Sequence, residues 1–256
     1  MADRTIFILG ASRGIGLGLV KEFLARGWQV VASERSRSDA LHALESEALR
    51  IVSCDVTRPD SYADFGFEDG QFDALVINAG ITGARHQDAM QATADEVADV
   101  MVTNAFGPAR AARTLLPVLR DGGTLAVMSS LMGSISDSSG GYDLYRTSKV
   151  ALNMLAKGVA EQHAAARGIA VLALHPGWVQ TDMGGPQAKL TIDESVNGLA
   201  DVLEGASGAG FRFVDYKGDE QGQLKVDVFP EGPNGEELDY LGSPDELIGQ
   251  AVTFNV

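Results

Sequence analysis

The sequence of 256 residues has little cysteine, little histidine and no long apolar run. Its one cysteine, Cys54, cannot form an internal disulfide, and four histidines offer few metal ligands, so we expect neither a disulfide nor a metal site. No stretch approaches the roughly 18 uninterrupted apolar residues that cross a bilayer, and Gly10 breaks the first apolar run too early for a signal peptide. These absences predict a soluble, cytoplasmic protein with no membrane partner.

Positive charge is scarce as well. The chain has 20 Lys and Arg residues against 35 Asp and Glu residues, which leaves a formal net charge of −15. Nucleic-acid binding draws its affinity from clustered basic side chains, so we expect no nucleic-acid partner. A chain of this length can bury one sizeable core, and its 45% apolar and 21% charged residues are typical of a globular protein. The composition therefore predicts one α/β domain.

Short runs rich in Val, Ile and Leu alternate with longer helical patterns, which is typical of stacked βαβ units. Strands are expected at Thr5–Leu9, Gln29–Ser33, Leu49–Ser53, Ala74–Asn78, Thr124–Ser129, Ile169–His175 and Phe211–Val214. Helices are expected at Gly14–Arg26, Ser38–Glu47, Ala94–Leu119, Tyr145–Arg167 and Asp193–Glu204. Right-handed crossovers then give a doubly wound, mostly parallel seven-stranded sheet with helices on both faces and ligands at the carboxyl ends of its strands.

The residues after Tyr216 follow another pattern. Two segments, Leu224–Val228 and Val252–Val256, alternate as half-buried strands and predict an added hairpin. From Lys217 onward there are nine acidic and two basic residues. We therefore expect residues 1–216 to form the main domain and residues 217–256 an acidic C-terminal extension. This extension is either a solvated acidic surface or a cover for the substrate cleft or a subunit contact.

A glycine-rich turn follows the first predicted strand and opens the first predicted helix. Its glycines, at positions 10, 14 and 16, let the backbone approach a pyrophosphate, and the helix N-terminus supplies unpaired amides. Strand, turn and helix stand in the order that dinucleotide binding requires. The turn therefore favours a bound nucleotide over a plain tight turn, with contacts from Gly10, Ser12, Arg13, Gly14, Ile15 and Gly16.

Tyr145 and Lys149 are four residues apart on a predicted helix, which places both side chains on one face. A phenol with a pKa near 10 is a poor base at neutral pH, and a nearby ammonium lowers that pKa. We therefore expect Lys149 to lower the pKa of Tyr145, which can then act as a general acid/base. The alternative is an ordinary surface pair.

Taken together, these motifs resemble the short-chain dehydrogenase/reductase family over roughly residues 4 to 220. The resemblance rests on the order and spacing of the glycine turn, Asp55-Val56, Asn78-Ala79-Gly80, Asn104, Ser129-Ser130, Tyr145, Lys149 and Pro176-Gly177. It implies a Rossmann-like domain that holds the cofactor and substrate sites together. The stretch HPGWVQTDMGG, residues 175–185, particularly resembles reductases similar to the bacterial C-factor signalling protein.

One residue departs from the family pattern. Leu9 stands where the family often has a threonine, whose hydroxyl ties the glycine turn to the fourth strand. We expect this loss to have modest structural consequences.

The resemblance implies an NAD(P)-dependent oxidoreductase that moves a hydride between nicotinamide and a carbonyl or secondary alcohol. Tyr145 would exchange a proton with the substrate oxygen, Lys149 would bind the nicotinamide ribose, and Ser130 would orient the substrate oxygen. Ser129 is the less favoured neighbour. Asn104 would hold a water that relays protons to Lys149, or would instead bend its helix and bond to the backbone.

The family pattern also implies contacts along the cofactor. Asp55 and Val56 would meet the adenine, and three residues would line the ribose path, namely Asn78, Ala79 and Gly80. A segment after the sixth predicted strand would meet the nicotinamide carboxamide, through Pro176, Gly177, Val179 and Thr181. His175, which precedes this segment, is expected to be a packed, hydrogen-bonded histidine.

The choice between NAD and NADP depends on the end of the second predicted strand. Glu34 can bond a free ribose 2′-hydroxyl, which favours NAD. Arg13 and Arg35 suit a 2′-phosphate, which favours NADP. Ion pairing among Glu34, Arg35 and Arg37 is compatible with either cofactor. The balance predicts NADP or NAD, with a preference for NADP.

The substrate is expected to be a small carbonyl compound or alcohol, in a partly apolar pocket suggested by Leu131, Tyr142, Trp178 and Met183. The resemblance also implies a homodimer or homotetramer. Two other functions stay open: a nucleotide-sensing regulatory protein without turnover, and an isomerase or dehydratase that uses the same Tyr145 and Lys149.

Overall fold

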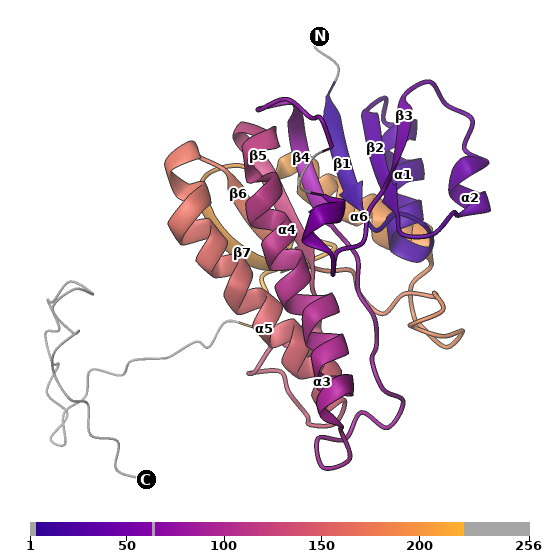
Figure 1. Ribbon diagram of the computed structural model, residues 1–256, viewed down its shortest axis with the longest axis vertical. Helices are drawn as coiled ribbons and strands as arrows, with labels where there is room; N and C mark the ends of the chain where they lie inside the picture. Colours follow the sequence, from indigo (N-terminus) through magenta and orange to yellow (C-terminus); the bar gives the residue numbers. More distant parts are fainter. Residues whose placement is uncertain (1–3, 63–64, 223–256) are drawn as a thin grey trace, which may run out of the picture. The chain divides into compact units, whose positions relative to one another are not determined.

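The computed structural model describes residues 4–62 and 65–222, which contain a seven-stranded parallel sheet in the order β3-β2-β1-β4-β5-β6-β7 (Figure 1). Its strands are β1 (Thr5–Leu9), β2 (Gln29–Glu34), β3 (Leu49–Ser53), β4 (Phe72–Ile77), β5 (Leu119–Met128), β6 (Ala170–His175) and β7 (Gly210–Asp215). The strand order reverses between β1 and β4, where such sheets bind ligands at their carboxyl ends. The predicted doubly wound fold is confirmed.

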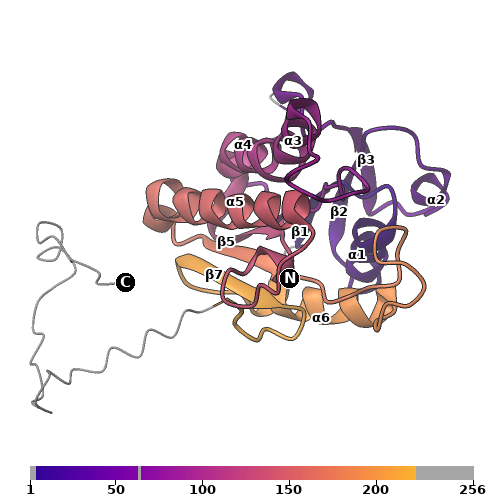
Figure 2. The same ribbon diagram turned by 90° about the horizontal axis from the view of Figure 1, so that it is seen from below.

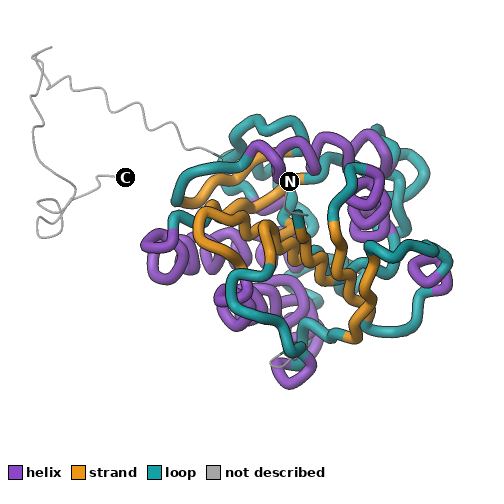
Figure 3. Tube along the Cα trace, turned by 90° about the horizontal axis from the view of Figure 1, so that it is seen from above, coloured by secondary structure: helices purple, strands orange, loops and turns teal. Residues whose placement is uncertain are grey.

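Helices cover both faces of the sheet (Figures 2 and 3). One face carries α3 (Ala94–Met101), α4 (Gly107–Leu115) and α5 (Asp143–Val159), and the other carries α1 (Gly14–Ala25) and α6 (Ile192–Gly205). The short α2 (Asp39–His42) lies beyond the β3 edge.

Alternate residues of each central strand enter different apolar cores. In β1, Phe7 and Leu9 join the cluster under α4 and α5, whereas Ile6 and Ile8 join the cluster under α1 and α6. A parallel strand covered on both faces therefore has no polar face, which explains its continuous apolar sequence.

Three predicted helices differ in extent from the structure. The helix expected at Tyr145–Arg167 is α-helical over Asp143–Val159 and continues as π-helical Ala160–Ala164 and 3₁₀-helical Ala165–Arg167. The helix expected at Ser38–Glu47 covers only Asp39–His42, because Ser46 forms a turn that leads into β3, with its hydroxyl accepting from the Ala48 N–H at 3.2 Å. Ser38 does cap α2, since its side chain accepts from the N–H of Leu41.

The helix expected at Ala94–Leu119 is interrupted by a π-helical segment, Val102–Phe106, and Leu119 already belongs to β5. Pro108 has no N–H to donate to the carbonyl of Asn104, four residues earlier, and the N–H of Gly107 reaches back to the carbonyl of Val102. The backbone hydrogen bonds thus shift by one residue around Asn104, so that an N–H reaches five residues back and not four.

The described chain ends just beyond β7. Val214 forms an antiparallel bridge with Glu220, and the N–H of Gln221 donates to the carbonyl of Phe213 at 2.8 Å. The two strands predicted at 224–228 and 252–256 lie outside the described residues. Within 4–62 and 65–222, the structure has no helix that combines the length and apolar character of a membrane span.

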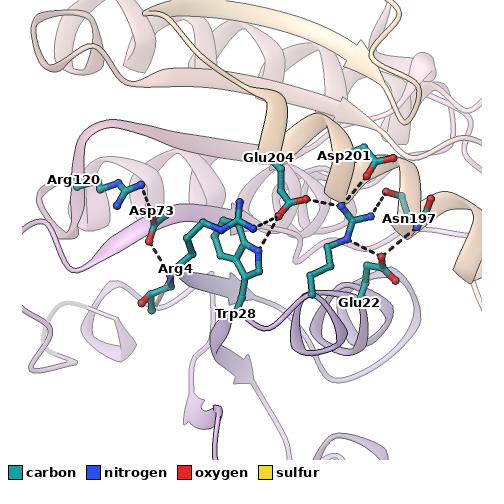
Figure 4. A network of polar contacts seen from close by, with 10 residues as sticks. Arg4, Glu22, Trp28, Asp73, Arg120, Asn197, Asp201 and Glu204 are labelled. Atoms are coloured by element: carbon teal, nitrogen blue, oxygen red, sulfur yellow. Dashed lines mark hydrogen bonds and ion pairs between the residues drawn. The ribbon is translucent and has the colours of Figure 1, made fainter. Parts of the chain in front are cut away.

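A polar network joins α1 to α6 (Figure 4). Arg26 contacts Glu22 through Nε at 2.8 Å and both Asp201 and Glu204 through Nη1 at 2.7 Å. Glu204 also pairs with Arg4 at 2.8 Å and accepts from Trp28 Nε1 at 2.9 Å. Although partial burial opposes it, these carboxylates raise the pKa of Arg26. The network holds together two helices that are far apart in sequence.

We expect Glu204→Gln to lower the free energy of unfolding by about 1–2 kcal/mol, because it removes the charge shared by two arginines from a mostly covered position. Urea unfolding at low and high salt measures the effect, which should shrink in high salt. Asp201→Asn is the matched control, since the Asp201 side chain is 66% exposed and contacts the same Arg26. Equal losses in the two variants would contradict this account.

Candidate active site

The glycine turn between β1 and α1 packs directly on the chain that follows β4. Gly10 has a φ of +91°, and a Cβ built on it would lie 2.7 Å from the backbone N of Ala79. A Cβ on Gly16 would lie 2.1 Å from the carbonyl oxygen of Gly10. A side chain at Gly10 would push the ends of β1 and β4 apart, and one at Gly16 would push α1 away from the turn, so close packing requires both glycines.

The N-terminus of α1 has no side-chain cap of its own, since Arg13 makes no capping hydrogen bond. The first-turn amides of α1 therefore suit the anionic pyrophosphate of a dinucleotide. The residues here fit the predicted cofactor.

Other hydrogen bonds replace the family hydroxyl that is missing at Leu9. The side-chain Nδ2 of Asn78 donates to the carbonyl of Gly10 at 2.7 Å, and the backbone N–H of Asn78 donates to the carbonyl of Leu9 at 2.8 Å. The Gly10 N–H donates to Ser33 Oγ at 2.9 Å. The turn is thus tied to both neighbouring strands without a threonine.

Asn104 lies at the centre of a buried polar contact. It is fully buried in the π-helical segment, its Oδ1 accepts from the Ile81 N–H at 2.8 Å, and its Nδ2 donates to the Ile81 carbonyl at 2.8 Å. The same Nδ2 donates to Ser148 Oγ at 3.0 Å, and that hydroxyl donates to the carbonyl of Tyr145 at 2.7 Å. The bent helix and backbone contacts agree with the second interpretation of Asn104, and the water relay stays a prediction.

Lys149 extends from α5 to the carboxyl end of β5. Its side chain is buried, and Nζ donates to the carbonyl of Met128 at 2.8 Å. Burial lowers the pKa of Lys149 to about 8, because the charged form loses hydration. A Cβ built on Gly80 would lie 3.5 Å from this Nζ and 3.3 Å from Asn104 Oδ1, so these three elements of the predicted site meet.

Tyr145 is close to Lys149, but its pKa does not fall. Burial raises the pKa of Tyr145 to about 12, and a hydrogen bond with Ser130 only partly opposes that rise. Lys149 Nζ lies 5.5 Å from the centre of the Tyr145 ring and is bonded to a carbonyl. The expected lowering of the phenol pKa is therefore wrong for this structure, because desolvation outweighs the hydrogen bond with Ser130.

The two serines after β5 differ in their contacts. Ser129 is buried and donates to Asn153 Oδ1 at 2.6 Å, whereas Ser130 contacts Tyr145 and caps a short turn. The structure thus places Ser130, the favoured candidate, beside the phenol.

The segment after β6 lies against the glycine turn. Thr181 is near Gly14, since its Cγ2 would be 3.5 Å from a Cβ built there, and Arg13 Nη1 is 3.4 Å from Asp182 Oδ2. Thr181 Oγ1 accepts from the Gly184 N–H at 3.0 Å. The carbonyl of Pro176 is fixed by the buried hydroxyl of Ser195, at 2.7 Å. Gly177 and Val179 belong to the same segment, which pairs with Leu190.

Glu34 lies at the end of β2, but its carboxylate is bonded within the protein. Oε2 accepts from the Ser38 N–H at 2.6 Å, and Oε1 is 2.8 Å from His42 Nε2. Burial opposes the shift, yet these contacts lower the pKa of Glu34. The structure pairs Glu34 with α2 in place of a salt bridge to Arg35 or Arg37, and Arg35 is exposed.

Asp55 follows β3 and accepts from the N–H and hydroxyl of Thr57, at 2.9 and 2.8 Å. Burial opposes the shift, but these bonds and Arg35 lower the pKa of Asp55. The neighbouring Val56 is buried, and its carbonyl would lie 2.6 Å from a Cβ on Gly107. Asp55 and Arg35 are thus near enough to interact at the predicted adenine end of the site.

Cys54 directly follows β3, and His175 is the last residue of β6. Cys54 is buried, and burial raises its pKa to about 11. His175 is packed, but its buried Nδ1 has no hydrogen-bond partner among the described residues, so the hydrogen-bonded histidine expected there is wrong at this atom. Burial lowers the pKa of His175 against the opposing charge of Asp215.

Sequence reasoning missed two residues. Gln87 is buried and bonds to Tyr145, although it lies 58 residues away in the chain. His42 holds Glu34 from α2. Neither Gln87 nor His42 belongs to a local sequence motif, and their distance along the chain from the other site residues does not predict their contacts.

Comparison with known proteins shows which family has these features. The family model described as short chain dehydrogenase matches residues 4–190. The chain belongs to this family. It is 40% identical over 155 residues to the C-signal of Myxococcus xanthus, which covers 59% of this chain and 92% of that protein. The predicted kinship with the family, and with C-factor-like members, is confirmed.

Solved structures of other short-chain dehydrogenases agree. One from Burkholderia multivorans with bound NADP is 39% identical, with a TM-score of 0.80 over 86% of this chain and 100% of that one. A carbonyl reductase from Pseudomonas aeruginosa PAO1 in complex with NADP is 39% identical, with a TM-score of 0.80 over 87% and 100%. These relatives agree with the predicted oxidoreductase class and nicotinamide cofactor.

The buried Lys149 predicts how stability depends on pH. Its pKa is about 8 in the folded chain, below the ordinary 10.5, so between these values the unfolded chain binds a proton that the folded chain does not. Stability from this group therefore rises with pH, by about 2 kcal/mol between pH 8 and 10. Urea unfolding of wild type and Lys149→Met across this pH range measures the contribution of Lys149 as the difference between their free energies of unfolding. The contributions of Cys54 and Tyr145, whose pKa values are also shifted, occur in both proteins and largely cancel in this difference. Parallel pH profiles of the two proteins would argue against this shift.

Proposed function

We propose that the chain is an NADP-dependent carbonyl reductase in which Tyr145 donates the proton to the substrate oxygen. The observation that carries this proposal is the meeting of Tyr145, Lys149, Asn104 and Ser130 at the carboxyl ends of β4 and β5, beside the glycine turn. When bound, the cofactor would supply the hydride, and the turn from Gly10 to Gly16 would hold its pyrophosphate.

The protonation state of Tyr145 favours the direction of reduction. A phenol with a pKa of about 12 carries its proton at neutral pH and can donate it as the carbonyl oxygen gains negative charge. Ser130 bonds the phenol and supplies a second donor for that oxygen. Lys149, with a pKa of about 8, is mostly charged at neutral pH and stabilises the phenolate that forms.

The contacts of Glu34 support NADP over NAD. Both carboxylate oxygens are bonded to α2, so a ribose 2′-hydroxyl would have to displace Ser38 or His42. Arg13 and Arg35 are exposed near the same end of the sheet and suit the charge of a 2′-phosphate.

The substrate is a carbonyl compound with an apolar body. Three large apolar side chains next to the site segments are half exposed, namely Tyr142, Trp178 and Met183. A relative from Arabidopsis thaliana, an NADPH-dependent pterin aldehyde reductase, is 31% identical over 194 residues, 72% of this chain and 78% of that protein. A homodimer or homotetramer stays a prediction from the family.

Tyr145→Phe should bind NADPH normally but lose at least about 100-fold in kcat, because the proton donor is removed while the backbone contacts remain. NADPH binding is measured by fluorescence titration, and turnover by NADPH consumption with hexanal, benzaldehyde and 2,3-butanedione. Tyr62→Phe is the matched control, because Tyr62 is buried in the core cluster under α4 and α5, outside the proposed site, and it should keep its turnover. The proposal fails if Tyr145→Phe retains wild-type kcat or if the wild type binds neither NADPH nor NADH.

His42→Ala should shift the cofactor preference toward NADH. Losing the bond from His42 frees one oxygen of Glu34 for the ribose 2′-hydroxyl, and one hydrogen bond of about 1 kcal/mol corresponds to roughly a 5-fold fall in the NADPH/NADH ratio of kcat/KM. Initial rates with both cofactors and one carbonyl compound give this ratio. Glu34→Ala in the same background should reverse the change, and His163→Ala should leave it alone. An unchanged ratio in His42→Ala would exclude Glu34 as the determinant.

A further inference from the structure

The N-terminus of the catalytic helix α5 is capped from elsewhere in the chain. Its own N-cap residue, Tyr142, makes no side-chain capping bond. Two first-turn donors are instead bonded to Gln87: the Asp143 N–H to its main-chain carbonyl at 2.9 Å, and the Tyr145 N–H to its side-chain Oε1 at 3.0 Å. Gln87 therefore supplies hydrogen-bond acceptors for first-turn N–H groups, which in most helices the N-cap residue provides.

The amide of Gln87 is fully engaged. It is buried, and while Oε1 accepts from Tyr145, Nε2 donates to the carbonyls of Thr82 at 2.9 Å and Ala84 at 2.6 Å. This pattern fixes the orientation of the amide, since the reverse orientation would place its NH₂ against the Tyr145 N–H and its oxygen against two carbonyls. A carboxamide suits this position better than a carboxylate or an apolar side chain.

The backbone at this contact is also unusual. Gln87 and Tyr142 both have a φ of +55°, and in the described parts of the chain they are the non-glycine residues with left-handed φ. They flank the same bond between Gln87 and Asp143. Strained conformations of this kind persist where surrounding contacts hold them, and they cluster at functional sites.

The contact joins two parts of the site. Asp143 Oδ2 accepts from the Ala89 N–H at 3.0 Å, so α5 and the loop of residues 81–92 exchange hydrogen bonds in both directions. The loop begins at Ile81, which Asn104 holds, directly after the predicted cofactor residues Asn78 to Gly80. Tyr145 is thereby fixed through its N–H by Gln87 and through its carbonyl by Ser148.

We propose that Gln87 is a positioning residue that sets the place of the Tyr145 phenol by holding the main-chain N–H of that residue. The proposal rests on the catalytic role of Tyr145 proposed above. Without this bond the first turn of α5 loosens, and the phenol with it. A displacement of about 1 Å at a reacting group can cost on the order of 100-fold in rate.

The decisive variant is Gln87→Met, which keeps the length of the side chain and removes both kinds of hydrogen bond. We expect kcat for NADPH-dependent reduction of the best of the three carbonyl compounds to fall about 10- to 100-fold, with the Kd for NADPH within twofold of wild type. Gln91→Met is the matched control, since Gln91 lies on the same loop, is exposed and bonds only to Asp88 among the described residues. It should behave as wild type.

Gln87→Glu tests the hydrogen bonds themselves. Protonated, the carboxyl can accept from Tyr145 and donate to one carbonyl, whereas ionised it faces the two carbonyls of Thr82 and Ala84. Nearby titratable groups include Asp143 and Tyr145 on α5, Arg85, His86 and Asp88 beside residue 87 in the chain, and Glu96 of α3, which pairs with His86. We expect kcat of Gln87→Glu to approach wild type at low pH and to fall as pH rises toward neutral. This fall lies below the Lys149 pKa of about 8, in a range where wild type and Gln87→Met should show none. A residue that merely fills space would not create this fall.

Amide hydrogen exchange gives a readout that does not need turnover. In Gln87→Met the Tyr145 amide should exchange faster, while the Asp143 amide, bonded to the main chain of residue 87, should keep more of its protection. The inference is overturned if wild type depends on Tyr145 yet Gln87→Met keeps wild-type kcat and Tyr145 protection. It is also overturned if Gln91→Met shows the same loss. Failure of the proposed function is distinct, because it appears as full turnover in Tyr145→Phe.

Discussion

Close backbone contact between the ends of β1 and β4, at Gly10 and Ala79, is the constraint on which the site depends. From this contact a chain of hydrogen bonds runs outward: Asn78 binds the Gly10 carbonyl, Asn104 binds both backbone groups of Ile81, and Ser148 links Asn104 to the Tyr145 carbonyl. Most of these bonds join a side chain to a backbone group, so the placement of Tyr145 depends on strand ends and not on its own helix alone. A change in the spacing of β1 and β4 would therefore move the Tyr145 phenol through this chain of hydrogen bonds.

Burial acts in opposite directions on the pKa values of Tyr145 and Lys149, the two groups proposed to be catalytic. It raises the pKa of Tyr145 to about 12 and lowers that of Lys149 to about 8, since each charged form loses hydration. Spacing of four on a helix shows that two side chains share a face, but it does not place an ammonium against a phenol oxygen. Here the Lys149 ammonium donates to the Met128 carbonyl and lies 5.5 Å from the ring centre. The same pair thus suits proton donation, which is the acid half of the general acid/base role expected from sequence.

Sequence was enough to locate the seven strands, because a strand buried on both faces, such as β1, is a continuous apolar run. The bounds of β1 and β3 were predicted as observed, whereas β5 begins at Leu119 and not at Thr124. Helix limits were less accessible, since Pro108 shifts the ladder around Asn104 and Ser46 forms a turn before β3. The glycine turn and the Tyr145–Lys149 pair are local motifs and could be found. Gln87 could not, because its function lies in a contact across 58 residues and a glutamine in a loop has no distinctive pattern.

The acidic residue at the end of β2 shows why residue identity alone does not predict cofactor choice. A carboxylate with free oxygens can bind a ribose hydroxyl at little cost, but Glu34 already accepts from Ser38 and contacts His42. A ligand hydroxyl would have to replace a hydrogen bond that α2 provides, so the net free energy gained by binding that hydroxyl is close to zero. The arginines have acidic neighbours too, Asp182 for Arg13 and Asp55 for Arg35, but the Arg13–Asp182 pair is exposed, and so is Arg35, so a 2′-phosphate displaces little. Selectivity therefore depends on how α2 occupies Glu34 as much as on Glu34 itself.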